Sequence, residues 1–124
     1  MPTPRRFLML AALVTPGLLA AAPAARAHLM VEGAEPADGA VLSSPPRSLA
    51  LRFSEASRIT SLRLVDEAGR EVPLRRDAAR GAVTSVTAGV TGPLTPGGYR
   101  VEWRAVGADG HVMNGTVHFT LTSR

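Results

Sequence analysis

The chain has 124 residues, a formal net charge of +4 and no cysteine. This length supports one small domain with a single core, and the lack of cysteine excludes disulfides and thiolate metal sites. Beyond the first 27 residues the arginines are scattered, with only Arg75 and Arg76 adjacent, so no basic patch for nucleic acid is expected.

The first 27 residues have the three parts of a secretory signal peptide. Arg5 and Arg6 form a basic start, residues 7–22 form an apolar run, and the small residues around Ala25-Arg26-Ala27 end the segment. The apolar run falls short of the roughly 20 residues that a membrane-spanning helix requires. A cleaved signal is therefore favoured over an uncleaved anchor.

We expect cleavage after Ala27, which would make His28 the first residue of an exported domain spanning 28–124. Cleavage after Ala24 or Ala25 is also chemically acceptable. Without Arg5, Arg6 and Arg26, 11 arginines face 10 acidic residues, so the mature net charge is +1.

The rest of the chain has the two-residue alternation of half-buried strands. It is clearest in residues 48–53, 61–66, 99–106 and 116–122, while residues 67–70 are typical of a turn. Proline and glycine pairs separate the remaining segments, and no segment has a helical period. The pattern predicts an all-β antiparallel sandwich or Greek-key barrel. The residues expected to face its core are Leu49, Leu51, Phe53, Leu62, Leu64, Tyr99, Val101, Trp103, Ala105, Val117, Phe119 and Leu121.

The three histidines occupy different positions in this pattern. His118 alternates with core residues and is expected on the solvent face. His111 lies in "GADGHVMNG" (107–115), the loop between the last two strands. Its Asp-Gly pair by itself is typical of a simple turn. His28 by itself is equally unspecific, because a processed chain must begin with some residue.

Together, His28, Asp109 and His111 form a plausible metal-binding set. A free N-terminal histidine offers a metal two nitrogens, its α-amine and its imidazole Nδ1. Asp109 and His111, two apart in an extended loop, are expected to point to the same side, roughly 7 Å apart at Cα. Three nitrogens and one carboxylate oxygen, without thiolate, suit tetragonal Cu(II) better than Cu(I).

Several segments together resemble the CopC family, periplasmic copper resistance proteins that bind Cu(II). They are the N-terminal histidine, "PADGA" (36–40), "LRFSE" (51–55), "LTPGGYRVEWRAVGADGH" (94–111) and "GTVHF" (115–119). The resemblance implies an immunoglobulin-like, cupredoxin-related, antiparallel Greek-key β-sandwich. It also implies one Cu(II) per chain, bound by His28, Asp109 and His111. Glu55, in "FSE", is assigned a supporting role, orienting the amine or an imidazole by a hydrogen bond.

The sequence departs from those family members that carry a methionine-rich Cu(I) loop in mid-chain. The corresponding stretch, "VPLRRDAARGAVTSV" (72–86), contains no methionine. Met30 and Met113 lie near the expected Cu(II) site, where we expect both to pack in the core. We therefore expect a single Cu(II) site and no shuttling of Cu(I) between two sites.

The interpretation is a periplasmic Cu(II) carrier or buffer, not an enzyme. The copper ion is its ligand, an inner-membrane copper transporter of the CopD type is a candidate partner, and a monomer without nucleic acid is expected. One alternative is an oxidative enzyme with a copper histidine brace, but an aromatic platform for a polymer is missing. The other is a metal-free immunoglobulin-like structural module, in which the Asp-Gly turn and His28 would be incidental.

Overall fold

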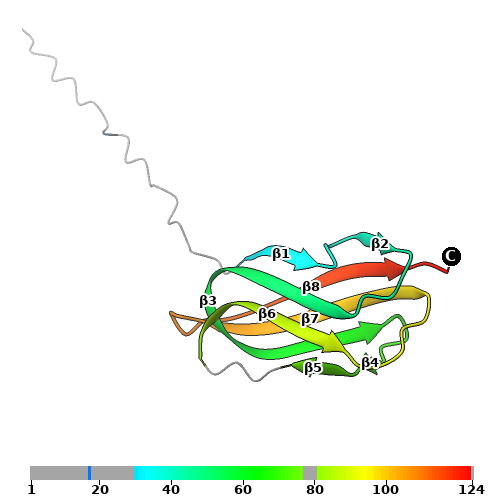
Figure 1. Cartoon of the computed structure of the whole chain (residues 1–124). Coiled ribbons are helices and arrows are strands. Elements are labelled where there is room, and N and C mark those ends of the chain that lie inside the picture. Colours follow the sequence, from blue (N-terminus) through cyan, green and yellow to red (C-terminus); the bar gives the residue numbers. More distant parts are fainter. Residues whose placement is uncertain (1–16, 18–29, 77–80, 124) are drawn as a thin grey trace, which may run out of the picture.

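The computed structural model describes residue 17 and residues 30–76 and 81–123, so the expected signal peptide, apart from Gly17, and His28 lie outside the described residues. In the described ranges the chain forms strands and no helix, which confirms the all-β expectation (Figure 1). Accordingly, nothing in those ranges is a helix long and apolar enough to cross a membrane. The eight strands are β1 (Val31–Glu35), β2 (Ala40–Leu42), β3 (Ser48–Asp66), β4 (Glu71–Val72), β5 (Leu74–Arg76), β6 (Val83–Val90), β7 (Gly97–Gly107) and β8 (Val112–Leu121).

The long strand β3 belongs to both layers of the sandwich. Its first part, residues 48–53, pairs with β1 on one side and with β6 on the other, and β5 extends this layer. Its second part, from Ser57 onward, pairs with β7 and β4, and β8 and β2 extend that layer. The expectation of two separate strands at 48–53 and 61–66 is therefore wrong, because one bent strand spans both.

Pairing is antiparallel throughout the described strands, except between β2 and β8, which run parallel. The short strand β2 lies at the edge of the second layer and meets β8 only at residues 119–121. Because a parallel neighbour must be distant in the chain, local alternation in the sequence could not reveal this pair.

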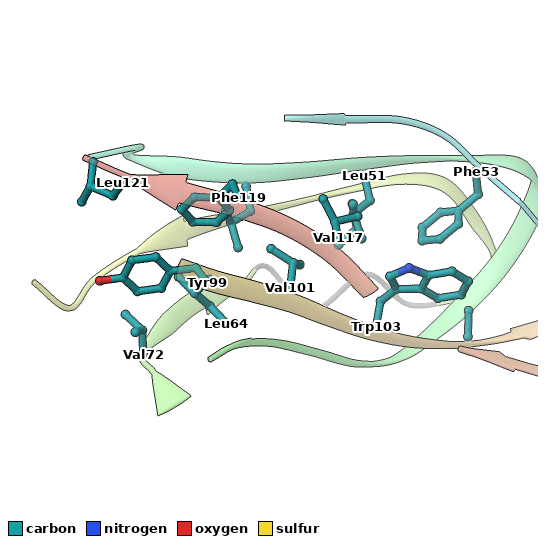
Figure 2. Close-up of a cluster of buried hydrophobic side chains, with 13 residues drawn as sticks. Leu51, Phe53, Leu64, Val72, Tyr99, Val101, Trp103, Val117, Phe119 and Leu121 are labelled. Atoms are coloured by element: carbon teal, nitrogen blue, oxygen red, sulfur yellow. The ribbon is translucent and has the colours of Figure 1, made fainter. Parts of the chain in front are cut away.

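The core contains nearly all the residues that alternation assigned to it (Figure 2). Eleven of the twelve are buried, and Leu62 is partly buried and packed against them. At one end Phe53 and Trp103 meet edge to face, with ring centroids 5.1 Å apart. Further along, Tyr99 and Phe119 stack with centroids 5.2 Å apart. Aromatic pairs at such separations stabilise a core beyond the area that they bury.

Gly115 makes room for the indole of Trp103. The two residues face each other across β7 and β8, and a Cβ at Gly115 would lie only 2.6–2.8 Å from Trp103 Cζ2, Cε2 and Nε1. Real side chains do not approach so closely, and the contact is with a rigid ring in a packed core. The position therefore requires glycine for space, whatever its backbone angles.

We predict that Gly115→Ala destabilises the fold by about 1–3 kcal/mol, because the added methyl overpacks the Trp103 site. The measurement is urea unfolding followed by Trp103 fluorescence. Gly89→Ala is the matched control, since the nearest atom to a Cβ there is 3.8 Å away. Equal, small losses in the two variants would contradict the packing argument.

Candidate metal centre

The connection between β7 and β8 is a tight turn. The N–H of Gly110 donates to the carbonyl of Gly107 at 3.0 Å, and the N–H of Gly107 donates to the carbonyl of His111 at 3.0 Å. Gly110 has φ +83°, a conformation that favours glycine. The expectation of an extended loop here is wrong, because these backbone bonds fold the segment back on itself. The expectation that Asp109 and His111 share one side is nevertheless confirmed.

Asp109 holds His111 through two hydrogen bonds. Its Oδ1 accepts the backbone N–H of His111 at 3.1 Å, and its Oδ2 lies 2.7 Å from His111 Nδ1. The hydrogen bond with the His111 side chain, aided by the one from its backbone, holds the pKa of the Asp109 carboxyl below its usual value. The side chains are 59% and 80% exposed, so the pair is open to solvent and to a metal ion.

Two other segments lie at the same end of the sandwich. The backbone of Met30, just before β1, donates to Ser54 Oγ at 3.0 Å and accepts the N–H of Ser54 at 2.8 Å. Three residues later, Ser57 pairs with Gly107 at the base of the β7–β8 turn. Figure 1 shows the start of β1, the bend of β3 and this turn together at the left end of the molecule.

The bend of β3 depends on Ser57, a fully buried serine that pairs with both β6 and β7. Its Oγ donates to the carbonyl of Glu55 at 3.0 Å. The register shifts between Arg52 and Ser57 against β6, and between Ile59 and Ser61 against β7. Such irregularities bend a strand and disrupt its ladder. The Ser57 hydroxyl satisfies a carbonyl that the bend takes out of the ladder.

Sequence reasoning overlooked Ser54 and Ser57. Both lie in "FSEAS" (53–57), and their only sequence signal was two serines interrupting an apolar alternation. Glu55 lies between them with an exposed side chain, and no hydrogen bond or ion pair of its carboxylate is found among the described residues. Its expected supporting role remains a prediction.

The remaining histidine and the two methionines lie in different environments. His118 is exposed on the solvent face of β8, as expected, and its Nδ1 lies 3.7 Å from Asp38 Oδ1. His118 lies seven positions after His111 along the extended chain, a separation of roughly 20 Å or more. Met113 packs against the core as expected. The same expectation for Met30 is wrong, because this side chain is 63% exposed beside the bend.

The described residues supply part of a ligand set. Asp109 and His111 offer one carboxylate and one imidazole, and no group of three or more metal-ligating side chains occurs within the described ranges. These donors suit borderline divalent metals such as copper or zinc. A complete site needs further donors, and the predicted ligand His28 lies outside the described residues.

Comparison with known proteins gives a consistent result. Residues 31–122 match the family model of the CopC domain. The chain is 31% identical over 105 residues to copper resistance protein C of Pseudomonas syringae pv. tomato, covering 78% of this chain and 82% of that protein.

Two solved structures share the fold. The structure of PcoC, a methionine-rich copper resistance protein from Escherichia coli, is 29% identical with a TM-score of 0.59, covering 77% of this chain and all of that one. The structure of CopC from Methylosinus trichosporium OB3b is 23% identical with a TM-score of 0.64, covering 78% and 96%.

We predict that Ser57→Ala lowers the free energy of unfolding by about 1–2 kcal/mol, because it leaves the Glu55 carbonyl without its buried donor. The measurement is chemical denaturation. Thr60→Ala is the control, since the Thr60 hydroxyl makes a similar bond, to the Arg104 carbonyl, but at an exposed position. An equal loss in both variants would mean that burial of the Ser57 bond contributes nothing.

Proposed function

The chain belongs to the CopC family, and we propose that it is a periplasmic protein that carries or sequesters one Cu(II) ion in copper homeostasis. The observation that carries the proposal is the exposed Asp109–His111 pair, held at the end of the sandwich where β1 begins. The relatives named as copper resistance proteins support copper as the metal.

We propose His28, Asp109 and His111 as the ligands. The backbone of Met30 is fixed to Ser54 by two hydrogen bonds, one with the Ser54 hydroxyl and one with its backbone N–H, and Ser57 pairs with the base of the β7–β8 turn. His28 precedes Met30 by two residues, so chain connectivity keeps their Cα atoms within roughly 7 Å. The N-terminal amine and imidazole would thus complete the set begun by Asp109 and His111. Glu55, on the bend between Ser54 and Ser57, would orient one of these donors by a hydrogen bond.

The donor set favours Cu(II) over Cu(I). The amine, two imidazoles and one carboxylate are nitrogen and oxygen donors, which suit a tetragonal Cu(II) ion. The chain has no cysteine, and the exposed Met30 is a single thioether. We therefore propose one Cu(II) per chain, with no second site for Cu(I).

Binding without catalysis is the function that the site supports best. A copper enzyme acting on a polymer needs an aromatic surface to grip it, yet Trp103 and Tyr99 are only 7% and 4% exposed. The sequence contains no other tryptophan or tyrosine. Cu(II) titration followed by an ascorbate-and-oxygen assay distinguishes the cases. Binding without turnover is expected, turnover would indicate an enzyme, and no binding would indicate a structural module.

The location and the partner follow from the same proposal. Residues 1–27 would direct export and be removed, so that the mature domain, 28–124, operates in the periplasm as a monomer. A membrane copper transporter of the CopD type is the proposed partner for exchange.

We predict that His111→Ala and Asp109→Ala each weaken Cu(II) binding at least about tenfold, since each removes one donor or the group that orients it. Titration of the unmodified domain should show one equivalent. His118→Ala is the control and should bind normally, because His118 lies far along β8. If His118→Ala weakened binding as much, the assignment of ligands would be wrong.

We predict that one extra residue before His28 leaves the fold intact and weakens Cu(II) binding by about tenfold or more. The added peptide bond turns the amine, which copper readily deprotonates from a reference pKa of about 7.7–8.0, into a poorly donating amide. Competition with a chelator at neutral pH compares the two forms. Equal dissociation constants would show that the amine is not a ligand.

A further inference from the structure

Part of β8 has a free edge. The β7–β8 ladder runs without a register shift from Val112 to Leu121. At His118 the backbone points away from β7, because its carbonyl accepts the Gly39 N–H at 2.7 Å and its N–H donates to Asp38 Oδ1 at 2.8 Å. Backbone groups alternate along an antiparallel strand, so the N–H and C=O groups of Val112, Asn114 and Thr116 also point away from β7.

No strand covers these three residues within the described part of the chain. The edge strand β2 meets β8 only at residues 119–121. The free stretch has neither the charged residues nor the proline that usually protect an exposed edge. It is therefore competent to pair with another strand over about five residues, or roughly 14 Å.

Asn114 and Thr116 of the free edge belong to one wall of a groove of about 580 Å³. The opposite wall is the start of β1, residues 30–34. The Arg52 guanidinium lies against Gly33 in this wall. The indole of Trp103 lies between the walls, with its Nε1 edge over Gly115. Figure 2 shows this ring at the Phe53 end of the core.

Trp103 gives the groove an unused donor. The residue is only 7% exposed, yet its indole N–H has no hydrogen-bond partner among the described residues. No fully enclosed polar side-chain atom in those residues lacks a partner, so this N–H must reach the surface, and Trp103 is one of the residues that line the groove. Water can hydrogen-bond to a donor at the surface, and a carbonyl entering the groove could replace that water.

We infer that the groove between β1 and β8 is a docking site for an extended, basic peptide segment of a partner protein, which adds to β8 as a strand. The backbone of the segment would pair with Asn114 and Thr116, and one of its carbonyls would accept the Trp103 N–H. The charged residues that line the groove are both acidic, Glu32 and Asp38, although Arg52 lies 3.9 Å from Glu32. This lining favours basic side chains.

A second copy of this chain fits the groove less well. The edge that it would offer for this pairing is its own β8, which is recessed between β7 and the β1 wall. Two recessed edges cannot each enter the groove of the other copy. Each copy would also bring Glu32 and Asp38 to the contact. A segment that is not already part of a folded sheet has neither difficulty.

The free edge of β8 continues beyond the groove, from Asn114 to Val112, which directly follows His111 of the candidate metal centre. A docked segment would therefore place one of its ends beside Asp109 and His111. We infer that docking positions a partner for metal exchange, and this last step rests on the proposed copper function.

The test uses the metal-free domain, so that it does not depend on copper. The probe is acetyl-Arg-Thr-Val-Thr-Val-Arg-amide, and the control is the same peptide N-methylated at alternate residues, with equal charge but no donors on one edge. The probe should slow amide exchange at Val112, Asn114 and Thr116 by about tenfold and shift the Trp103 indole resonance. Equal effects of the methylated peptide, or no effect of either, would overturn the proposal.

Two variants sharpen the test. Trp103→Phe keeps a ring but removes the N–H, and Thr116→Lys adds a charge on the edge; both should weaken probe binding several-fold. Val41→Lys adds the same charge at a similarly exposed strand position outside the groove and should bind normally. If Val41→Lys weakened binding as much as Thr116→Lys, general charge repulsion would explain the effect and the proposal would fail.

Amide exchange measured without the probe tests whether a second copy or the chain itself occupies the groove. Protection that rises with protein concentration, together with a dimer mass by light scattering, would identify a second copy as the occupant. Protection at every concentration would mean that the chain covers its own edge. Either result contradicts a partner peptide. A domain that docks the probe but does not bind Cu(II) would retain the docking site and refute the copper function alone.

Discussion

The hydrogen bond from the Ser57 hydroxyl to the Glu55 carbonyl stabilises the bend that joins the two layers of the sandwich. A strand that changes sheets must interrupt its ladder, and each backbone group freed in the interior needs a new partner. Ser54, three residues earlier, bonds the chain just before β1, while Ser57 pairs with the base of the β7–β8 turn. The bend therefore brings the start of β1 and the β7–β8 turn to one end.

The contact between Trp103 and Gly115 links the core to the surface groove. Without a Cβ at Gly115, the indole lies against β8 with its Nε1 edge toward the groove. The ring and the N–H of this side chain are thus in different environments. The ring is buried against Phe53, while its N–H has no partner in the described fold. A surface-reaching donor without a protein partner, beside a free strand edge, is the physical basis for the proposed docking site.

The candidate centre is oriented by local bonds and not by burial. Asp109 fixes the imidazole of His111 through the turn that both share, and both side chains remain largely exposed. An exposed site can exchange metal with a partner without opening the core. It also gives the metal little protection from solvent, which suits the proposed transport or buffering role better than the redox chemistry of an enclosed site.

The sequence by itself determined the all-β class, the inward faces of four strand segments and the shared side of Asp109 and His111, because these follow from alternation and close spacing in the chain. Family-specific segments also carried the resemblance to CopC. Only the tertiary structure decided that residues 48–66 form one bent strand, that Met30 is exposed, and that β2 runs parallel to β8. Each depends on contacts between residues far apart in the chain, such as Met30 with Ser54 and Ser57 with Gly107, which no local pattern records.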